Sequence, residues 1–267
     1  MHARTLDDNA LLTARALRRL VAGLTLAAAA IVLLGAVTDI DLRLADAFYD
    51  AHTHAFPWRH AWLTERFGHG IVKMALTALA VCLVAVSAAD GAVRAYNRRR
   101  SGAGWLPSWW RTRLAVLAAS SVLVPLATSL LKRASHSHCP WDLARYGGSH
   151  AYYRLLDSMP DWVAAGHCLP GGHASTALWL VALAVFWLPH QPRTAASIAA
   201  LMLGAGGALG WLQQMRGAHF LTHTLWSMWI ATAIVTGLLF LQQRGPTLRR
   251  APRRRAIAPS WPPSLRA

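Results

Sequence analysis

Long apolar segments alternate with short polar ones along most of this sequence. A helix needs about 20 mainly apolar residues to cross the hydrocarbon core of a bilayer. Six segments approach or reach that length: residues 20–38, 71–89, 114–131, 174–188, 195–212 and 221–241. The fourth is the shortest and can be extended through His173. The pattern therefore predicts an all-α fold, a six-transmembrane helical bundle.

The arginines indicate how this bundle is oriented. They gather before the first span, between the second and third spans, between the fourth and fifth, and after the sixth. These four regions fall on one side of a six-span topology, and the positive-inside rule makes that side cytoplasmic. We therefore expect a cytoplasmic segment (residues 1–19), a membrane domain (20–243) and a basic, disordered cytoplasmic tail (244–267). The expected location is the bacterial inner membrane, with the active site facing the periplasm.

Composition narrows the choice of partner. The 267 residues are 55% apolar and 14% charged, with a formal net charge of +16. A strongly basic protein is often a nucleic-acid binder. Here the arginines flank apolar spans, so we expect a lipid bilayer as the partner and no nucleic acid. The oligomeric state is not fixed by the sequence.

Glycines recur in the fifth span, at Gly204, Gly206, Gly207 and Gly210. They either allow neighbouring helices to approach closely or simply weaken the helix, and the sequence supports both interpretations equally.

The segment between the first two spans, residues 39–69, is rich in aromatic and charged residues. It allows a short amphipathic helix on the outer surface.

Three polar clusters stand at the ends of apolar segments, at residues 132–140, 170–173 and 216–223. Basic residues and histidines are costly near hydrocarbon, so they suggest function there. In the expected topology all three clusters lie on the outer side. Together they supply what phosphoryl transfer needs: cations for the phosphate oxygens, a nucleophile and a proton donor.

The three clusters resemble the signature of the type 2 phosphatidic acid phosphatases, which are integral-membrane relatives of the vanadium haloperoxidases. That signature reads Lys, six residues, Arg-Pro; then Pro-Ser-Gly-His; then Ser-Arg, five residues, His, three residues, Asp. Lys132 and Pro140 match the first motif, but Cys139 stands in place of arginine. In the second motif Pro170, Gly172 and His173 match, and Gly171 replaces serine.

The third motif departs further. The resemblance implies that His219 is the nucleophile and His173 the proton donor, while His223 takes the place of the aspartate that orients the nucleophile. Gln213 then occupies the arginine position, although Arg216 is one turn away. Two alternatives stay open. His223 could be the nucleophile with Arg216 as its partner, at a spacing one residue too long, or both histidines could only satisfy backbone groups at a helix end.

The resemblance also implies a phosphate-binding set. Lys132, Gly172 and Arg216 are its expected members, and Arg133 and Arg145 are candidates to replace the missing arginine. Because the first two motifs should meet at the site, we expect a disulfide between Cys139 and Cys168. The alternative is two free thiols packed under the outer loop.

The leading functional hypothesis is a metal-independent phosphatase of a membrane lipid phosphate or diphosphate, working through a phosphohistidine. We expect no cofactor, and the histidines of the outer loop have no convincing metal-ligand frame. A lipid phosphotransferase with the same site is a close alternative. A transporter that relays protons through intramembrane histidines is a more distant one, because the polar residues gather at span ends.

Overall fold

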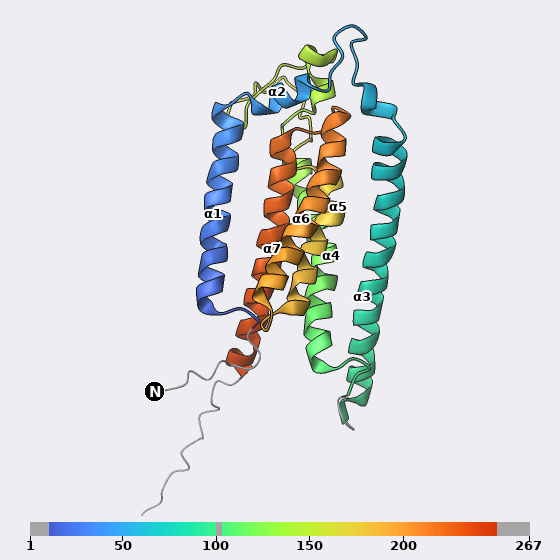
Figure 1. Cartoon of the computed structure of the whole chain (residues 1–267), viewed down its shortest axis with the longest axis vertical. Coiled ribbons are helices and arrows are strands. Elements are labelled where there is room, and N and C mark those ends of the chain that lie inside the picture. Colours follow the sequence, from blue (N-terminus) through green and yellow to red (C-terminus); the bar gives the residue numbers. More distant parts are fainter. Residues whose placement is uncertain (1–10, 100–102, 250–267) are drawn as a thin grey trace, which may run out of the picture.

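The structure is a computed structural model that describes residues 11–99 and 103–249. Helical segments run up and down the molecule in six passes (Figure 1). Five of them are long and apolar enough to cross a membrane. In chain order the passes are α1 (Ala14–Val37), α3 (Val72–Tyr96), α4 (Ser108–Ala134), α5 (Gly172–Leu178) continued by the 3-10 helix η6 (Trp179–Trp187), α6 (Pro192–Met215) and α7 (Leu221–Arg249). The predicted all-α membrane bundle is confirmed.

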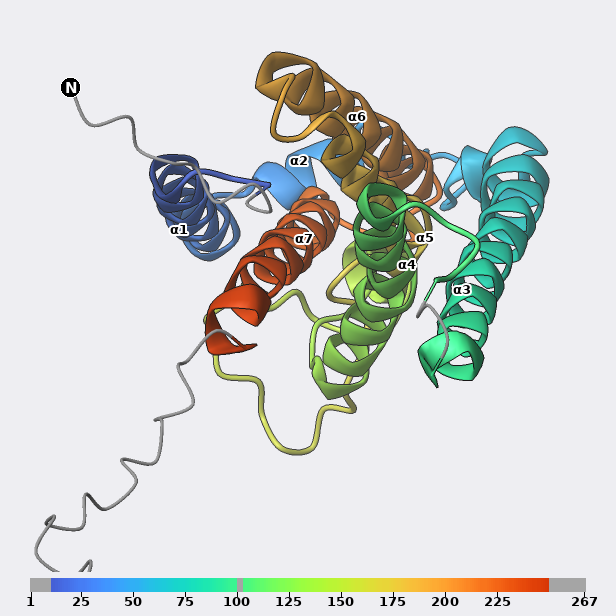
Figure 2. The same ribbon diagram turned by 90° about the horizontal axis from the view of Figure 1, so that it is seen from below.

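The pass formed by α5 and η6 is short in residues but not in length. Seven α-helical residues rise by about 10 Å, and nine 3-10 residues rise by about 18 Å. Their sum of about 28 Å is close to the thickness of the hydrocarbon core, roughly 30 Å. The pass packs against α4, α6 and α7, which Figure 2 shows around it. Trp179, Ala182 and Val185 are almost fully buried there.

Two of the four glycines in α6 allow close packing. A Cβ on Gly206 would lie 2.3 Å from the Leu178 side chain, and one on Gly210 would lie 2.3 Å from Thr224. Around Gly204 nothing lies within 4 Å. Close approach of α6 to α5 and α7 therefore explains Gly206 and Gly210 but not Gly204.

The first and last helices of the bundle extend past the predicted spans. Helix α1 begins at Ala14, so part of the predicted N-terminal segment is helical. Helix α7 continues to Arg249, into the tail predicted to be disordered. Residues 1–10 and 250–267 of these two segments lie outside the described residues. The start of α1, the end of α3, the starts of α4 and α6, and the end of α7 share one end of the bundle (Figure 1).

At the other end, a short helix and a long loop cover the bundle. The helix is α2 (Ile40–Asp46), within the segment predicted to hold one. The loop, residues 135–171, is fastened by two ion pairs to this helix and to its N-cap residue. Arg145 binds both carboxylate oxygens of Asp46, at 2.8 and 2.7 Å, and Arg154 binds Asp39 at 2.5 Å.

A carboxylate of α2 also sets the position of α7. Asp41 is 4% exposed and accepts hydrogen bonds from the backbone N–H of Thr222 (3.0 Å) and from its hydroxyl (2.5 Å). Burial raises the pKa of Asp41, and the bonds from Thr222 act in the opposite direction. The carboxylate serves as a cap for a backbone donor in the first turn of α7. It thereby fixes the helix end that carries His223.

Candidate active site

The structure brings four of the predicted site residues together below the outer loop. Lys132 comes from the last turn of α4, and its Cδ lies 4.0 Å from where a Cβ on Gly172 would stand. His173 lies in the first turn of α5, with its ring centroid 5.9 Å from that of His219. The rings of His219 and His223 are 5.7 Å apart. All three motifs therefore meet, although they are far apart in the sequence.

His219 is almost fully enclosed by the protein. It is 3% exposed and precedes the first residue of α7. Burial lowers the pKa of His219 well below its ordinary value of 6.5, and the nearby His223 and Lys132 lower it further. The imidazole is therefore neutral at pH 7. A neutral imidazole keeps a lone pair on one ring nitrogen, which is the form that can attack phosphorus.

The second motif is bound to the backbone of His223. Gly171 donates its N–H to the His223 carbonyl oxygen (3.0 Å), and Ser227 donates its hydroxyl to the Gly171 carbonyl (2.9 Å). A Cβ on Gly171 would lie 3.4 Å from the same His223 oxygen. The glycine that replaces the family's serine thus lies directly against α7.

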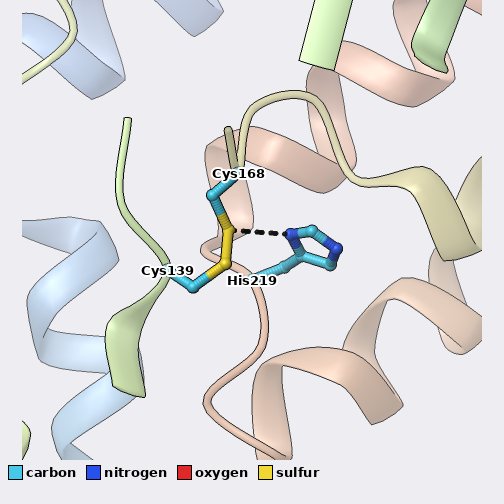
Figure 3. Close-up of side chains that lie close together, drawn as sticks. All are labelled: Cys139, Cys168 and His219. Atoms are coloured by element: carbon cyan, nitrogen blue, oxygen red, sulfur yellow. Dashed lines mark hydrogen bonds between the residues drawn. A yellow bond between two sulfur atoms is a disulfide. The ribbon is translucent and has the colours of Figure 1, made fainter. Parts of the chain in front are cut away.

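Cys139 and Cys168 form a disulfide, with their α-carbons 5.3 Å apart. Figure 3 shows the bridge beside His219, where Cys168 Sγ lies 3.5 Å from Nδ1. Cys139, which stands at the arginine position of the first motif, is therefore bonded to Cys168 beside His219. Among the described residues, the two sulfurs and this ring form a group close enough to hold a metal ion. Cysteine ligates metals as a thiolate, and sulfurs bonded to each other supply none.

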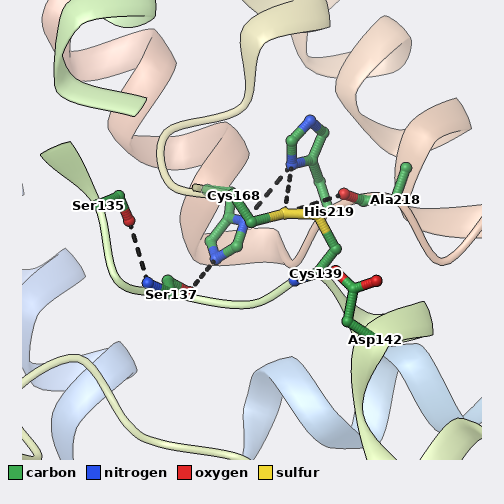
Figure 4. Close-up of a disulfide and its surroundings, with 8 residues drawn as sticks. Ser135, Ser137, Cys139, Asp142, Cys168, Ala218 and His219 are labelled. Carbon is green, nitrogen blue, oxygen red and sulfur yellow. Dashed lines mark hydrogen bonds between the residues drawn. A yellow bond between two sulfur atoms is a disulfide. The ribbon is translucent and has the colours of Figure 1, made fainter. Parts of the chain in front are cut away.

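Beside the disulfide, the start of the outer loop contacts the third motif. Ser137 Oγ lies 3.2 Å from His223 Nε2, and Nδ1 of the same ring lies 3.5 Å from His219 Nδ1. Figure 4 shows Ser137 on the loop that leads to Cys139, close to the disulfide. Sequence reasoning did not identify Ser137. Its position inside the first cluster was the available signal, but no spacing rule distinguishes it from Ser135.

Two predicted phosphate ligands have their donors engaged elsewhere. Arg216 donates to the Arg59 carbonyl oxygen (2.9 Å) and to Gln213 (3.0 Å), and lies 3.7 Å from Glu65. Arg145 forms the ion pair with Asp46. Both arginines therefore bind segments that cover this end of the bundle, and their role as phosphate ligands stays a prediction.

Arg133 follows Lys132 in the last turn of α4. It is exposed, and it lines a groove of about 440 Å³ with Ser129, Lys132 and His167. The cation adjacent to the histidines is Lys132, which lowers the pKa of His219. Arg133 stays a candidate second cation because it shares this groove.

Comparison with known proteins agrees with this geometry. A search of curated proteins and a search of solved structures find no match. The family model of the PAP2 superfamily matches residues 110–245, just over half of the chain. The matched region contains all three motifs, α5 and α6, and most of α4 and α7. The chain therefore belongs to the PAP2 superfamily, and its membership supports a phosphatase-type activity.

Proposed function

We propose that this protein is an integral-membrane phosphatase that hydrolyses a lipid phosphate or diphosphate through a phosphohistidine. The observation that supports the proposal most is the convergence of Lys132, His173, His219 and His223 at one end of the bundle. Two histidine rings with centroids 5.9 Å apart can reach one phosphoryl group between them. The chemistry needs a nucleophile, a proton donor and a cation, and these residues supply each.

In the first step, a ring nitrogen of His219 forms a bond to phosphorus as the bond to the leaving oxygen breaks. His173 gives its proton to that oxygen. In the second step, water attacks phosphorus, His173 takes a proton from the water, and the phosphorus–nitrogen bond breaks to release phosphate. Lys132 holds the equatorial oxygens in both steps. No metal ion is needed in this scheme.

The activity test is phosphate release in the presence of a chelator. Suitable lipids are phosphatidic acid, phosphatidylglycerol phosphate, a polyprenyl diphosphate and lipid A phosphate. His219→Ala is the inactive control. Absence of release from every lipid by the wild-type protein would refute the proposal. With a second lipid present, mass analysis of products separates a hydrolase from a phosphotransferase.

Lys132 and His173 allow sharper tests. Losing a cation aimed at the phosphoryl group should slow turnover by roughly a hundredfold or more, by analogy with a lost oxyanion donor, so near-normal turnover of Lys132→Ala would remove it from the mechanism. The loss of activity in His173→Ala should be smallest for substrates with good leaving groups. Equal losses on good and poor leaving groups would contradict its role as proton donor.

The proposed location is the bacterial inner membrane, with both termini cytoplasmic and the site facing the periplasm. Two features support it: the arginine-rich connections share one end of the bundle, and the disulfide lies at the other end, as an oxidising compartment permits. Introduced cysteines test this in a Cys82→Ser background. An impermeant thiol reagent should label Ser149→Cys in intact cells but not Ser101→Cys, which lies outside the described residues. The reverse pattern would refute the orientation.

A further inference from the structure

The ring of His223 is held between two side chains. Its Nε2 lies 3.2 Å from Ser137 Oγ, and its Nδ1 lies 3.5 Å from His219 Nδ1. Both histidines are 3% exposed. The three side chains therefore form a row that begins at the proposed nucleophile and ends in the outer loop. Both ring nitrogens of His223 have a partner in this row.

The disulfide fixes where the protons of this row lie. Cys168 Sγ lies 3.5 Å from His219 Nδ1 and is bonded to Cys139, so it carries no hydrogen and can only accept one. A proton on His219 Nδ1 suits both this sulfur and the His223 nitrogen. The lone pair of His219 is then on Nε2. Because His223 Nδ1 accepts from His219, the proton of neutral His223 is on Nε2, where it donates to Ser137 Oγ.

The loop holds Ser137 firmly in this position. Its carbonyl oxygen accepts from Cys168 N–H (2.9 Å), and its own N–H donates to Ser135 Oγ (3.2 Å). The neighbouring backbone of residues 135–136 accepts two further hydrogen bonds from residues 166–167. Gly166 permits this contact, since a Cβ there would lie 2.5 Å from His138 Cα. The Cys139–Cys168 disulfide joins the same two loop segments directly after this contact.

We propose that Ser137 is a positioning residue that fixes the tautomer of His223 and thereby aims Nε2 of His219 at phosphorus. The inference rests on the proposed function. An aspartate in the place of His223 would have no tautomer to fix, whereas a histidine needs a partner that accepts from Nε2. Ser137 is that partner.

The row also stabilises the charge that develops during the reaction. As the phosphorus–nitrogen bond forms at Nε2, positive charge develops on the His219 ring, whose Nδ1–H donates to Nδ1 of neutral His223. His223 in turn donates its Nε2–H to the Ser137 hydroxyl. When water breaks the phosphorus–nitrogen bond, the lone pair returns to Nε2 of His219. Charge on the His219 ring strengthens its hydrogen bond to His223, which Ser137 keeps in the accepting tautomer.

Ser137→Ala tests the inference by kinetics, with phosphatidic acid and a polyprenyl diphosphate as probes. Loss of the hydrogen bond that holds His223 in this tautomer should lower kcat by about 2- to 10-fold, with KM and the unfolding midpoint unchanged. Ser137→Thr should restore most of the rate. Ser137 and His223 line a cavity of about 400 Å³, which has room for the added methyl group. Ser149→Ala, in an exposed part of the same loop, is the matched control and should keep the wild-type rate.

A double variant separates positioning from a general loss of structure. In a His223→Ala background, Ser137→Ala should lower the rate no further, because its partner is absent. A second loss as large as the first would overturn the inference. So would an unchanged kcat in Ser137→Ala or a failure of Ser137→Thr to recover.

The tautomer can be measured without any turnover. In nitrogen-15 NMR of the histidine-labelled protein, with His223→Gln for assignment, His223 should carry its proton on Nε2. Ser137→Ala should give a mixture of tautomers. A wild-type His223 protonated on Nδ1 overturns the positioning role but leaves the proposed function intact. The expected tautomer without phosphate release from any lipid overturns the proposed function instead.

Discussion

Removal of the Cys139–Cys168 disulfide should destabilise the protein by an amount that the structure sets. The bridge joins residues 29 apart in the sequence. Treated as loop-closure entropy, a closed loop of that size contributes about 3.6 kcal/mol at 25 °C. At roughly 2 to 4 °C per kcal/mol for a domain of this size, the unfolding midpoint should fall by about 7 to 14 °C. The loss should arise mainly from greater freedom of the unfolded chain.

The assay is thermal unfolding in detergent micelles, followed by tryptophan fluorescence. The variant is Cys139→Ala with Cys168→Ala, which leaves no new thiol. Cys82→Ala is the matched control, because Cys82 is an exposed free cysteine in α3 and should leave the midpoint unchanged. Thiol titration of the denatured wild-type protein without reductant should find one reactive group among its three cysteines. Three reactive groups, or a double variant within about 2 °C of wild type, would refute the reasoning.

Two further predictions concern packing and pH. Gly210→Ala should lower the free energy of unfolding by about 1 to 3 kcal/mol through overpacking, since its Cβ would lie 2.3 Å from Thr224. Gly204→Ala is the control and should not destabilise the protein, because nothing lies within 4 Å of its Cβ. Equal unfolding midpoints for the two variants would contradict this. Because the pKa of His219 is lowered well below 6.5, the acid limb of the kcat/KM profile that reports the neutral nucleophile should lie below pH 6.5. As the pH falls below 6.5, the unfolded chain binds a proton at His219 more readily than the folded protein does, so the free energy of unfolding should decrease. An acid limb at or above pH 6.5 would contradict the assignment of His219 as the nucleophile.

Much of the fold could be predicted because hydropathy records burial in lipid directly. The first residue of α7 is the predicted start of the sixth span. The fourth pass was harder, because a 3-10 segment makes a short sequence long enough and hydropathy carries no sign of it. The glycines of α6 were ambiguous for a related reason. Only the neighbouring helix decides that Gly210 meets a side chain and Gly204 does not.

The site was predictable to the extent that its motifs have fixed spacing. Lys132, His173, His219 and His223 meet as the motifs require. The arginines were less predictable, because their partners are remote in sequence. Arg145 binds a carboxylate 99 residues away and Arg216 a carbonyl 157 residues away. In the sequence alone, their positive charge is equally compatible with binding a phosphate and with binding these protein groups.

The central claim is that His219 carries the phosphoryl group, and trapping the intermediate tests it most directly. The wild-type protein is mixed with phosphorus-32-labelled phosphatidic acid or polyprenyl diphosphate and quenched in alkali, in which phosphohistidine survives. The protein should carry a label that acid removes, and peptide mapping should place the label on His219. His219→Ala should carry none. Label on His223, or label that persists in His219→Ala, would contradict the account.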